Sequence, residues 1–522
     1  MPSTALRALP AIACLALPAL PATAQVSPAE VWASWQASFG ADGEQITLRT
    51  GSVSEAGGTL TVTDAELVFE PDMEGADGNA RISIGLGDIV FADQGDGTVA
   101  IALAEEMPIS LTGVDEDGIP FDARFGVSLR GTQIVASGSA EALQHDARSD
   151  AIAVSLEEMR PMEEGTDLEI SVILNGLVQQ SLVEEGAVRR TTFSSAADSL
   201  AYALAARIDG DGSFSLDYES ADYTVTGSVA IPEGHDGTEN VGVLLADDAY
   251  GVRFTSSTSG SAANLSFEDT APGGDVDFAG AAGSVDLMIG AGEQTVSLAE
   301  GGLSVASRAE AITGAMISDQ LPVPVAITLG STSFTLASPL SPRETEGEMR
   351  LGLSLRDLSI DDFLWDLFDP AAVLPRDPAT FVLDIAALGR WIVDPFNESA
   401  LAAQEDDELP GEVSSARIEA LELRAAGARV TAEGGVSFDY TDRETFDGLP
   451  APDGEVSARI EGVGGLIDKL VMMGLVPQEQ SMGARLMLGL FASPVPGEED
   501  VFTSNLVVAP DGSVFANGQQ IR

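Results

Sequence analysis

The sequence offers few side chains that could perform catalysis. It holds two histidines, His145 and His235, ninety positions apart and each in a polar, turn-like setting. We interpret both as solvated loop residues, because neither has neighbouring candidates for a metal site or a catalytic triad. No HExxH helix or Gly-x-Ser-x-Gly turn accompanies them, and the single lysine, Lys469, follows no Gly-rich phosphate loop. The sequence therefore predicts no catalytic residue, no metal ligand and no cofactor-binding residue.

Acidic residues form the densest group of oxygen ligands, in one short segment: Asp209, Asp211, Ser213, Asp217 and Glu219. Their spacing is similar to the start of a calcium-binding EF-hand loop, which needs Gly at its sixth position and Glu at its twelfth. This sequence has Phe214 and Ser220 there, so we interpret the segment as a hairpin turn with acidic side chains on the strands. A carboxylate-based hydrolase stays open, because 83 acidic residues supply carboxylate pairs by chance.

Residues 1–24 predict a cleavable signal peptide. Arg7 precedes an apolar stretch at 9–20, and Ala22-Thr23-Ala24 fits the small-x-small cleavage rule. Cleavage would leave a mature chain from Gln25 in the periplasm and would remove Cys14, the one cysteine. Disulfides, thiol nucleophiles and thiolate metal sites are then excluded. Lipoprotein attachment at Cys14 is an alternative, although the residues before it match that signal poorly.

The formal charge of −58 limits the partners. A field of this sign repels nucleic acid and anionic lipid headgroups beyond a Debye length of about 8–10 Å. No later apolar run approaches the roughly 18 residues of a membrane-spanning helix. We therefore expect no nucleic-acid partner and no transmembrane segment in the mature chain, and a lipid or an envelope protein as its partner.

Alternating apolar and polar residues predict strands along most of the chain, for example from Met349 to Leu355 and from Phe381 to Ile385. Phe214, Leu216 and Tyr218 alternate with polar residues, and Tyr223 and Val225 do the same after what we interpret as the turn of a hairpin. Ten Asp-Gly dipeptides are spread along the chain, and Asp-Gly favours the type I′ turns that join antiparallel strands. The predicted fold is therefore mainly β with a few helices (α+β), with extended antiparallel sheets.

Four helices are predicted. The first begins with a capping box at Ser27-Pro28-Ala29-Glu30, and its Val31, Trp32, Trp35 and Phe39 share one face. The others are predicted from apolar spacing, at Ser195 to Ile208, from Ser359 to the residue before Pro370, and from about Leu466 with a break at Pro477.

These elements suggest three regions after the signal peptide. We expect an N-terminal helix with antiparallel strands over 25–190, a central β region with one helix over 191–345, and a C-terminal β region over 346–522 with two to three helices and a terminal hairpin. The motif Ser-Ala-Arg-Ile-Glu occurs at 415–419 and again at 457–461. More loosely, the strand-into-helix stretch from Leu353 to Phe368 matches Val456 to Val471 in the placement of apolar residues. These two echoes suggest repeated strand-helix units.

Three segments resemble domain-of-unknown-function family number 2125, a family of exported proteins from Gram-negative bacteria. They are VWASWQASFGADG at 31–43, the segment from LRDLSIDDFLWDLFDP to ATFVLDIAAL at 355–388, and the segment from DKLVMMGLVP to SVFANGQQI at 468–521. The resemblance implies no catalytic residues. Gly512 with Asn517-Gly518 also resembles the terminal hairpin of AsmA-like envelope proteins, which implies a role in lipid traffic or outer-membrane maintenance.

The expected function is a non-enzymatic periplasmic β-scaffold that binds a hydrophobic ligand or an envelope partner along a sheet face. Two alternatives stay open, a purely structural or assembly protein and a carboxylate-based hydrolase of the envelope. An apolar groove left open on a sheet favours the binder, whereas sheet faces consumed as core favour the structural protein. A concave pocket holding two carboxylates would favour the hydrolase.

Overall fold

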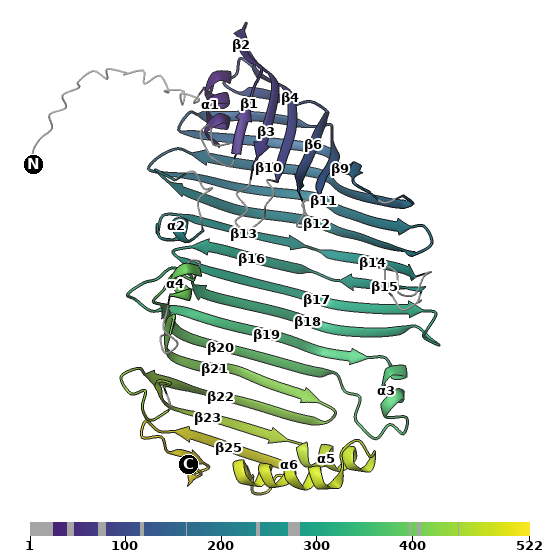
Figure 1. Ribbon diagram of the computed structural model, residues 1–522, viewed down its shortest axis with the longest axis vertical. Coiled ribbons are helices and arrows are strands. Elements are labelled where there is room, and N and C mark those ends of the chain that lie inside the picture. The colour runs from purple at the N-terminus through teal and green to yellow at the C-terminus, as the bar shows by residue number, and fades with distance from the viewer. Residues whose placement is uncertain are drawn as a thin grey trace, which may run out of the picture.

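The computed structural model describes residues 25–38, 46–70, 80–114, 119–162, 164–235, 241–269, 282–395, 398–403, 409–446 and 448–522. The predicted signal peptide and Phe39 lie outside the described residues. The fold is mainly β, as predicted, and the strands belong to one large antiparallel sheet (Figure 1). In the description below, the sheet is divided into a closed end, formed by the first eight strands with the first helix, and an open sheet from β10 to β25.

The closed end contains the helix α1 (Pro28–Ser38) and short strands. The strands are β1 (Ile46–Arg49), β2 (Ser52–Ala56), β3 (Thr59–Phe69), β4 (Arg81–Asp93), β5 (Val99–Ala102), β6 (Glu106–Val114), β7 (Pro120–Arg130) and β8 (Gln133–Ser139). β1 and β2 both pair with β3, and β7 and β8 both pair with the long strand β9 (Ala142–Arg160). These strands fold over one end of the sheet (Figure 1).

The open sheet is a succession of strands, most of which pair with the strands next to them in the chain. They are β10 (Thr166–Glu184), β11 (Val188–Ile208), β12 (Gly212–Pro232), β13 (Gly251–Thr258), β14 (Gly260–Asp269), β15 (Ala282–Ile289), β16 (Gly292–Ala299), β17 (Gly302–Ser318), β18 (Val325–Pro339), β19 (Gly347–Ile360), β20 (Ala379–Trp391), β21 (Gly411–Ala425), β22 (Ala428–Asp439), β23 (Ala451–Glu461), β24 (Ser493–Pro494) and β25 (Val501–Val508). β13 and β14 together pair along β12, and β16 and β15 together pair along β17.

The remaining elements lie at the edges and at the carboxy terminus (Figure 1). They are the helices α2 (Val241–Leu245), α3 (Asp362–Phe368), α4 (Glu398–Ala402), α5 (Val463–Met472) and α6 (Gln478–Phe491) and the strands β26 (Val514–Ala516) and β27 (Gln519–Gln520). The terminal hairpin at Asn517-Gly518 is confirmed, and both residues have the positive φ of a type I′ turn.

The predicted capping box of α1 is confirmed. The Ser27 N–H donates to Glu30 Oε2 at 2.8 Å, and the Glu30 N–H donates to Ser27 Oγ at 3.3 Å. The predictions of α3 and of the α5–α6 pair are also confirmed, and α3 begins after Asp361, whose carboxylate accepts a hydrogen bond from the Phe363 N–H at 2.9 Å.

Two local predictions are wrong. The predicted helix at Ser195 to Ile208 lies within β11, where Leu200, Leu204 and Ile208 are also even-numbered positions of an alternating strand. Pairing with β10 on one side and β12 on the other decides the conformation against the local helix propensity of an alanine-rich segment. The predicted hairpin at 214–225 is one continuous strand, β12.

A line of irregular residues crosses the open sheet and explains the second error. The strand pairing is interrupted where Gly176, Asp222, Ala311 and Asp357 adopt positive φ. In β12 the apolar residues are even-numbered before Asp222 and odd-numbered after it. The paired strands keep the same register on both sides of each interruption, so neighbouring strands change phase together. The change of phase keeps the apolar side chains on one face. We call these four residues the kink line.

The structure does not support repeated strand-helix units. Both copies of Ser-Ala-Arg-Ile-Glu lie in strands, at 415–419 in β21 and at 457–461 in β23. In the described residues between them, β21, β22 and β23 follow one another without an intervening helix. That echo therefore reflects two similar strands of one meander. In the looser match, 353–368 runs from β19 into α3 and 456–471 runs from β23 into α5, but no helix of the described residues follows β21 or β22.

Candidate functional site

One row of paired residues runs across the open sheet on a single face. Side chains at directly paired positions of antiparallel strands point to the same face. The register pairs, strand after strand, the following residues: Phe193, Gly227, Phe254, Val296, Val305, Leu336, Leu351, Ile385 and Ile418. We call this set the apolar row. From Phe254 to Ile418 it is apolar on seven successive strands, and it continues through Gly434 and Val456 to Leu506.

Within the described residues, no second layer covers the apolar row. A covered sheet face buries every second side chain of its strands. In the described strands from β11 to β21, the buried apolar side chains are Ala197, Val325 and Val382, none of which belongs to the row. In Figure 1 no helix crosses the middle of these strands. The row is therefore an apolar surface on the outside of the protein.

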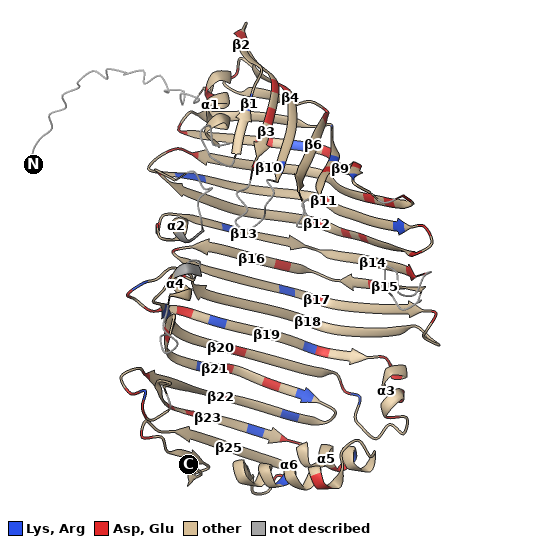
Figure 2. Cartoon of the chain, viewed as in Figure 1, with Lys and Arg blue, Asp and Glu red and all other residues tan. Residues whose placement is uncertain are grey.

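The opposite face of the same strands is polar. The neighbouring register line pairs Ser194, Thr226, Thr255, Thr295, Ala306, Thr335, Gly352 and Asp384. Hydroxyl groups bridge these strands, for example Thr255 Oγ1 to Thr295 Oγ1 at 2.9 Å. Ion pairs join the later strands, where basic and acidic residues lie side by side in Figure 2, such as Arg350 with Asp384 at 2.7 Å. The open sheet thus has one face suited to apolar ligands and one suited to water.

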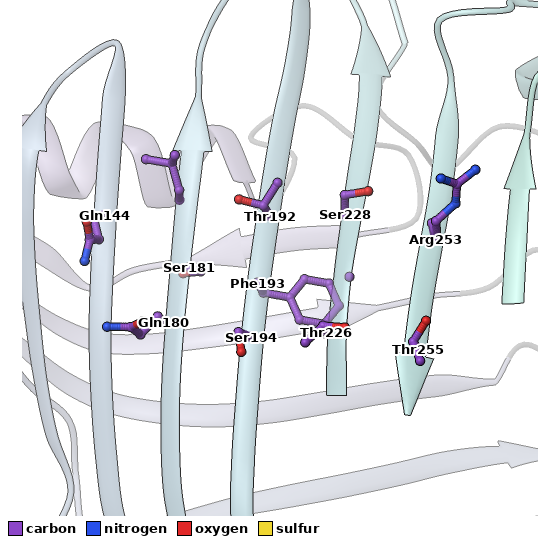
Figure 3. A pocket seen from close by; sticks show the side chains of 12 residues that line it. Gln144, Gln180, Ser181, Thr192, Phe193, Ser194, Thr226, Ser228, Arg253 and Thr255 are labelled. Atoms are coloured by element: carbon purple, nitrogen blue, oxygen red, sulfur yellow. The ribbon is translucent and has the colours of Figure 1, made fainter. Parts of the chain in front are cut away.

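A hollow of about 540 Å³ lies against the polar face near the closed end. The labelled side chains in Figure 3 come mainly from glutamine, serine and threonine residues of β9 to β13, with Arg253 at one side. Phe193 also lines it, and its ring packs against Gly227, where a Cβ atom would lie 2.5 Å from Cζ. With mostly uncharged polar walls, the hollow has no feature that selects a ligand.

At the closed end the row enters a covered core. Register carries the line from Phe193 through Ser181, His145 and Ala136 to Val99. Ala136 and Val99 are buried against Trp32 of α1 in the core of the closed end. The same face of the sheet is therefore covered at this end and bare beyond it.

His145 lies at the boundary between the two. Its Nε2 accepts a hydrogen bond from Trp35 Nε1 at 3.0 Å, and burial lowers its pKa despite the nearby Asp146. The prediction of a solvated loop histidine is therefore wrong for His145, which is a strand residue of β9. A smaller hollow of about 270 Å³ opens here, between Trp35 and Ser181. His235 lies in a turn after β12, as predicted.

Neither candidate for metal or acid chemistry becomes a site. The segment Asp209 to Asp211 forms the turn between β11 and β12, as predicted. In the described part of the chain, no group of three or more His, Cys, Asp or Glu residues is placed to hold a metal ion. A hollow of about 700 Å³ contains Glu419, Glu422 and Glu433. Glu422 pairs with Arg429 at 2.9 Å and Glu419 pairs with Arg417, so ion pairing accounts for two of the three carboxylates.

None of the apolar row was singled out as a site from the sequence. Its signal was present, because Leu351 and Ile385 belong to alternating strands that the sequence predicts. The sequence does not reveal the register that aligns these strands. It also does not reveal whether a second layer covers them. As for membrane crossing, none of the helices in the described ranges is long and apolar enough to span a bilayer.

Comparison with known proteins identifies the family and nothing more. No curated protein matches the chain. Residues 267–519 match the family described as "Uncharacterized protein conserved in bacteria (DUF2125)". Two of the three resembling segments lie almost entirely within this match, the segment at 31–43 lies outside it, and the likeness to AsmA-like proteins has no support. From the end of β14 to the terminal hairpin, which is just under half of the chain, the protein is similar to the uncharacterised bacterial family DUF2125.

Proposed function

We propose that the protein is a lipid-binding scaffold of the periplasm that holds an acyl chain along the apolar row. The observation that carries the proposal is the uncovered row itself. Val305, Leu336 and Ile385 belong to successive or nearby strands and expose part of their side chains to solvent. Contiguous apolar surface of this kind is rare on soluble proteins outside binding sites.

The length of the row fits one or two acyl chains. Strands lie about 4.8 Å apart, so the seven strands from Phe254 to Ile418 span roughly 29 Å. The hydrocarbon core of a bilayer is about 30 Å thick, which corresponds to two opposed acyl chains. Each methylene group transferred from water to such a surface contributes up to about 0.8 kcal/mol. A single chain lying along the row therefore gains enough burial to bind.

The edges of the row favour a lipid over a flat protein surface. The helix α2 packs Leu244 and Leu245 against Val252 and Leu298, which lie on the same face beside the row. At the end of the row near β11, the closed end covers the same face, with Trp35 and His145 at the boundary. A helix beside the row and a covered core at one end leave a partly bordered apolar face, which suits a flexible chain better than a rigid partner. The net charge of −58 disfavours anionic headgroups, so neutral or zwitterionic lipids are the expected ligands.

The test uses two adjacent residues of β18 that point to opposite faces. Leu336→Glu places a charge in the apolar row, and Thr335→Glu places the same charge on the polar face. The probe is a lysophosphatidylcholine with a fluorescent acyl chain, used below its micelle concentration with residues 25–522. We expect Leu336→Glu to weaken probe binding by at least about tenfold, because a charge in the apolar contact is poorly solvated. Thr335→Glu should leave binding unchanged.

The structural alternative makes the opposite prediction. If the row serves only assembly, the wild-type protein binds no probe, and native mass spectrometry of protein purified gently from its own periplasm finds no lipid. Equal binding by both variants would also reject the proposal, because the probe would then lie elsewhere. Circular dichroism of each variant checks that the sheet is intact.

A further inference from the structure

The helical pair α5–α6 lies beyond the last long strand, at the end of the sheet opposite to the closed end (Figure 1). Asp500 holds the start of α5, accepting hydrogen bonds from the Gly464 N–H at 3.0 Å and the Gly465 N–H at 2.8 Å. Arg485 of α6 pairs with Asp468 of α5. The start of the pair is therefore attached beside β25, and an ion pair holds the two helices together.

The helix α6 has almost no buried side. Of its 14 residues only Ser481 is buried, and Leu488 and Phe491 are half-buried on the same side. The Phe491 carbonyl anchors the end of the helix, accepting from Ser504 Oγ at 2.6 Å and Asn517 Nδ2 at 3.0 Å. An isolated helix of this length is only marginally stable in water, and most helices gain stability by packing one face. α6 therefore lacks the cover that a helix of its length needs.

The uncovered side of the pair is strongly apolar. Met482, Leu486 and Leu490 follow at intervals of four and form one stripe on α6, opposite the side that carries Ser481 and Leu488. Leu486 is 73% exposed. We call the following exposed residues the helix patch: Met472, Leu475, Met482, Leu486, Met487 and Leu490.

The charge of this segment differs from that of the whole chain. Residues 463–492 contain two acidic residues, Asp468 and Glu479, and two basic residues, Lys469 and Arg485. Their sum is zero, in a chain whose net charge is −58. The pair is thus a neutral, apolar tip on an acidic protein, and it can approach an uncharged surface without local repulsion.

We propose that the helix patch docks into the interface of a bilayer of zwitterionic lipid. An amphipathic helix that lies in the membrane plane buries its apolar side among the headgroups and upper acyl chains. The patch has the leucine and methionine side chains for this, and the zero net charge of residues 463–492 suits a lipid surface without net charge. This docking is independent of the apolar row, although it would bring the open end of that row to a lipid source.

The test is flotation of residues 25–522 with phosphatidylcholine vesicles. The variant Leu486→Glu/Leu490→Glu changes two exposed residues of the patch. The control Ile317→Glu/Leu449→Glu places the same charges at two equally exposed apolar residues elsewhere, of which Leu449 is 63% exposed. We expect the wild type and the control to float with the vesicles. The patch variant should lose at least about tenfold in vesicle affinity, because each leucine transferred from water to lipid is worth about that factor or more.

Three results would overturn the proposal. The first is a wild type that does not float, and the second is a patch variant that floats as well as the control. The third is a wild type that is a dimer without vesicles when the patch variant is a monomer, which would assign the patch to a second copy of the chain. Adding anionic phosphatidylglycerol should weaken wild-type flotation because of the net charge. The acyl-chain proposal is tested separately, since the patch variant should still bind the lysophosphatidylcholine probe and Leu336→Glu should still float.

Discussion

The closed end and the open sheet are built from the same alternating pattern, but apolar side chains are buried in the first and partly exposed in the second. In the closed end Phe91 is fully buried and its ring lies 5.8 Å from Trp32 and 5.4 Å from Trp35, centroid to centroid. In the open sheet Phe334, beside the apolar row, is 36% exposed. Both phenylalanines lie in strands and point to an apolar face. Whether that face becomes core depends on what covers it, and α1 supplies cover at one end only.

This difference separates two uses of apolar residues. Those of the closed end stabilise the fold, because removing them leaves a cavity. Those of the open sheet contribute less to stability, since they keep part of their contact with water. A residue whose loss costs little stability but weakens lipid binding belongs to the second group.

The sharpest test of the comparison is the same substitution at both ends. Phe91→Ala should destabilise the protein by about 3–5 kcal/mol, because the cavity lies in a closed core. Phe334→Ala should cost roughly 1–2 kcal/mol, because less area is lost from a face already in contact with solvent. Urea unfolding followed by circular dichroism and tryptophan fluorescence measures both. Equal losses would contradict the division into a closed and an open region.

A smaller effect is expected at the kink line, which belongs to the open sheet. Gly176 has a φ of +66°, and a Cβ atom there would lie 2.1 Å from Asp198 Oδ2. Gly176→Ala should therefore cost about 1–2 kcal/mol through backbone strain and the shift of Asp198. Ala311→Gly should act in the opposite direction, by up to about 1 kcal/mol, because Ala311 already adopts a φ of +52°. Thermal unfolding of the two variants provides the measurement, and a shared sign would show that the kink line is not strained.

The smallest effect is expected at the boundary, from His145. Burial lowers the pKa of His145 from 6.5, so below about pH 6.5 the unfolded chain binds a proton that the folded chain does not. Stability from this residue is therefore complete above that pH and is lost as the pH falls further. His145→Gln keeps an acceptor for Trp35 and removes the titration. The wild type should lose more thermal stability than this variant between about pH 7.5 and about pH 5.5, and a parallel loss would place the acid sensitivity elsewhere.

The sequence predicts strands well where alternation is long and uninterrupted, as at Leu351 to Leu355, and it predicts the first helix where a capping box marks it, at Ser27. It fails at 195–208, where small residues and a spacing of four imitate a helix. It fails also at Asp222, where the alternation changes phase. There a kink within one strand and a hairpin turn leave similar patterns in the sequence, and only the pairing with β11 distinguishes them.

The sequence predicts the strands and helices that contribute to the candidate site, but not how they come together. Each strand shows its apolar alternation in sequence, but the row from Phe254 to Ile418 depends on register between strands as far apart in the chain as β13 and β21. Leu486 and Leu490 are similar, because their spacing indicates a helix with an apolar side and says nothing about whether that side is covered. Burial at these positions is a property of the assembled sheet.

Because β18 to β22 each pair only with the strand before and the strand after, this part of the molecule behaves as a one-dimensional array. A two-strand hairpin could be inserted or deleted here without redesigning a central core. Each such change would lengthen or shorten the molecule by about 10 Å, two strand spacings, while leaving both tips intact. The reach of the protein can thus be adjusted in fixed steps during evolution, independently of what its ends contact.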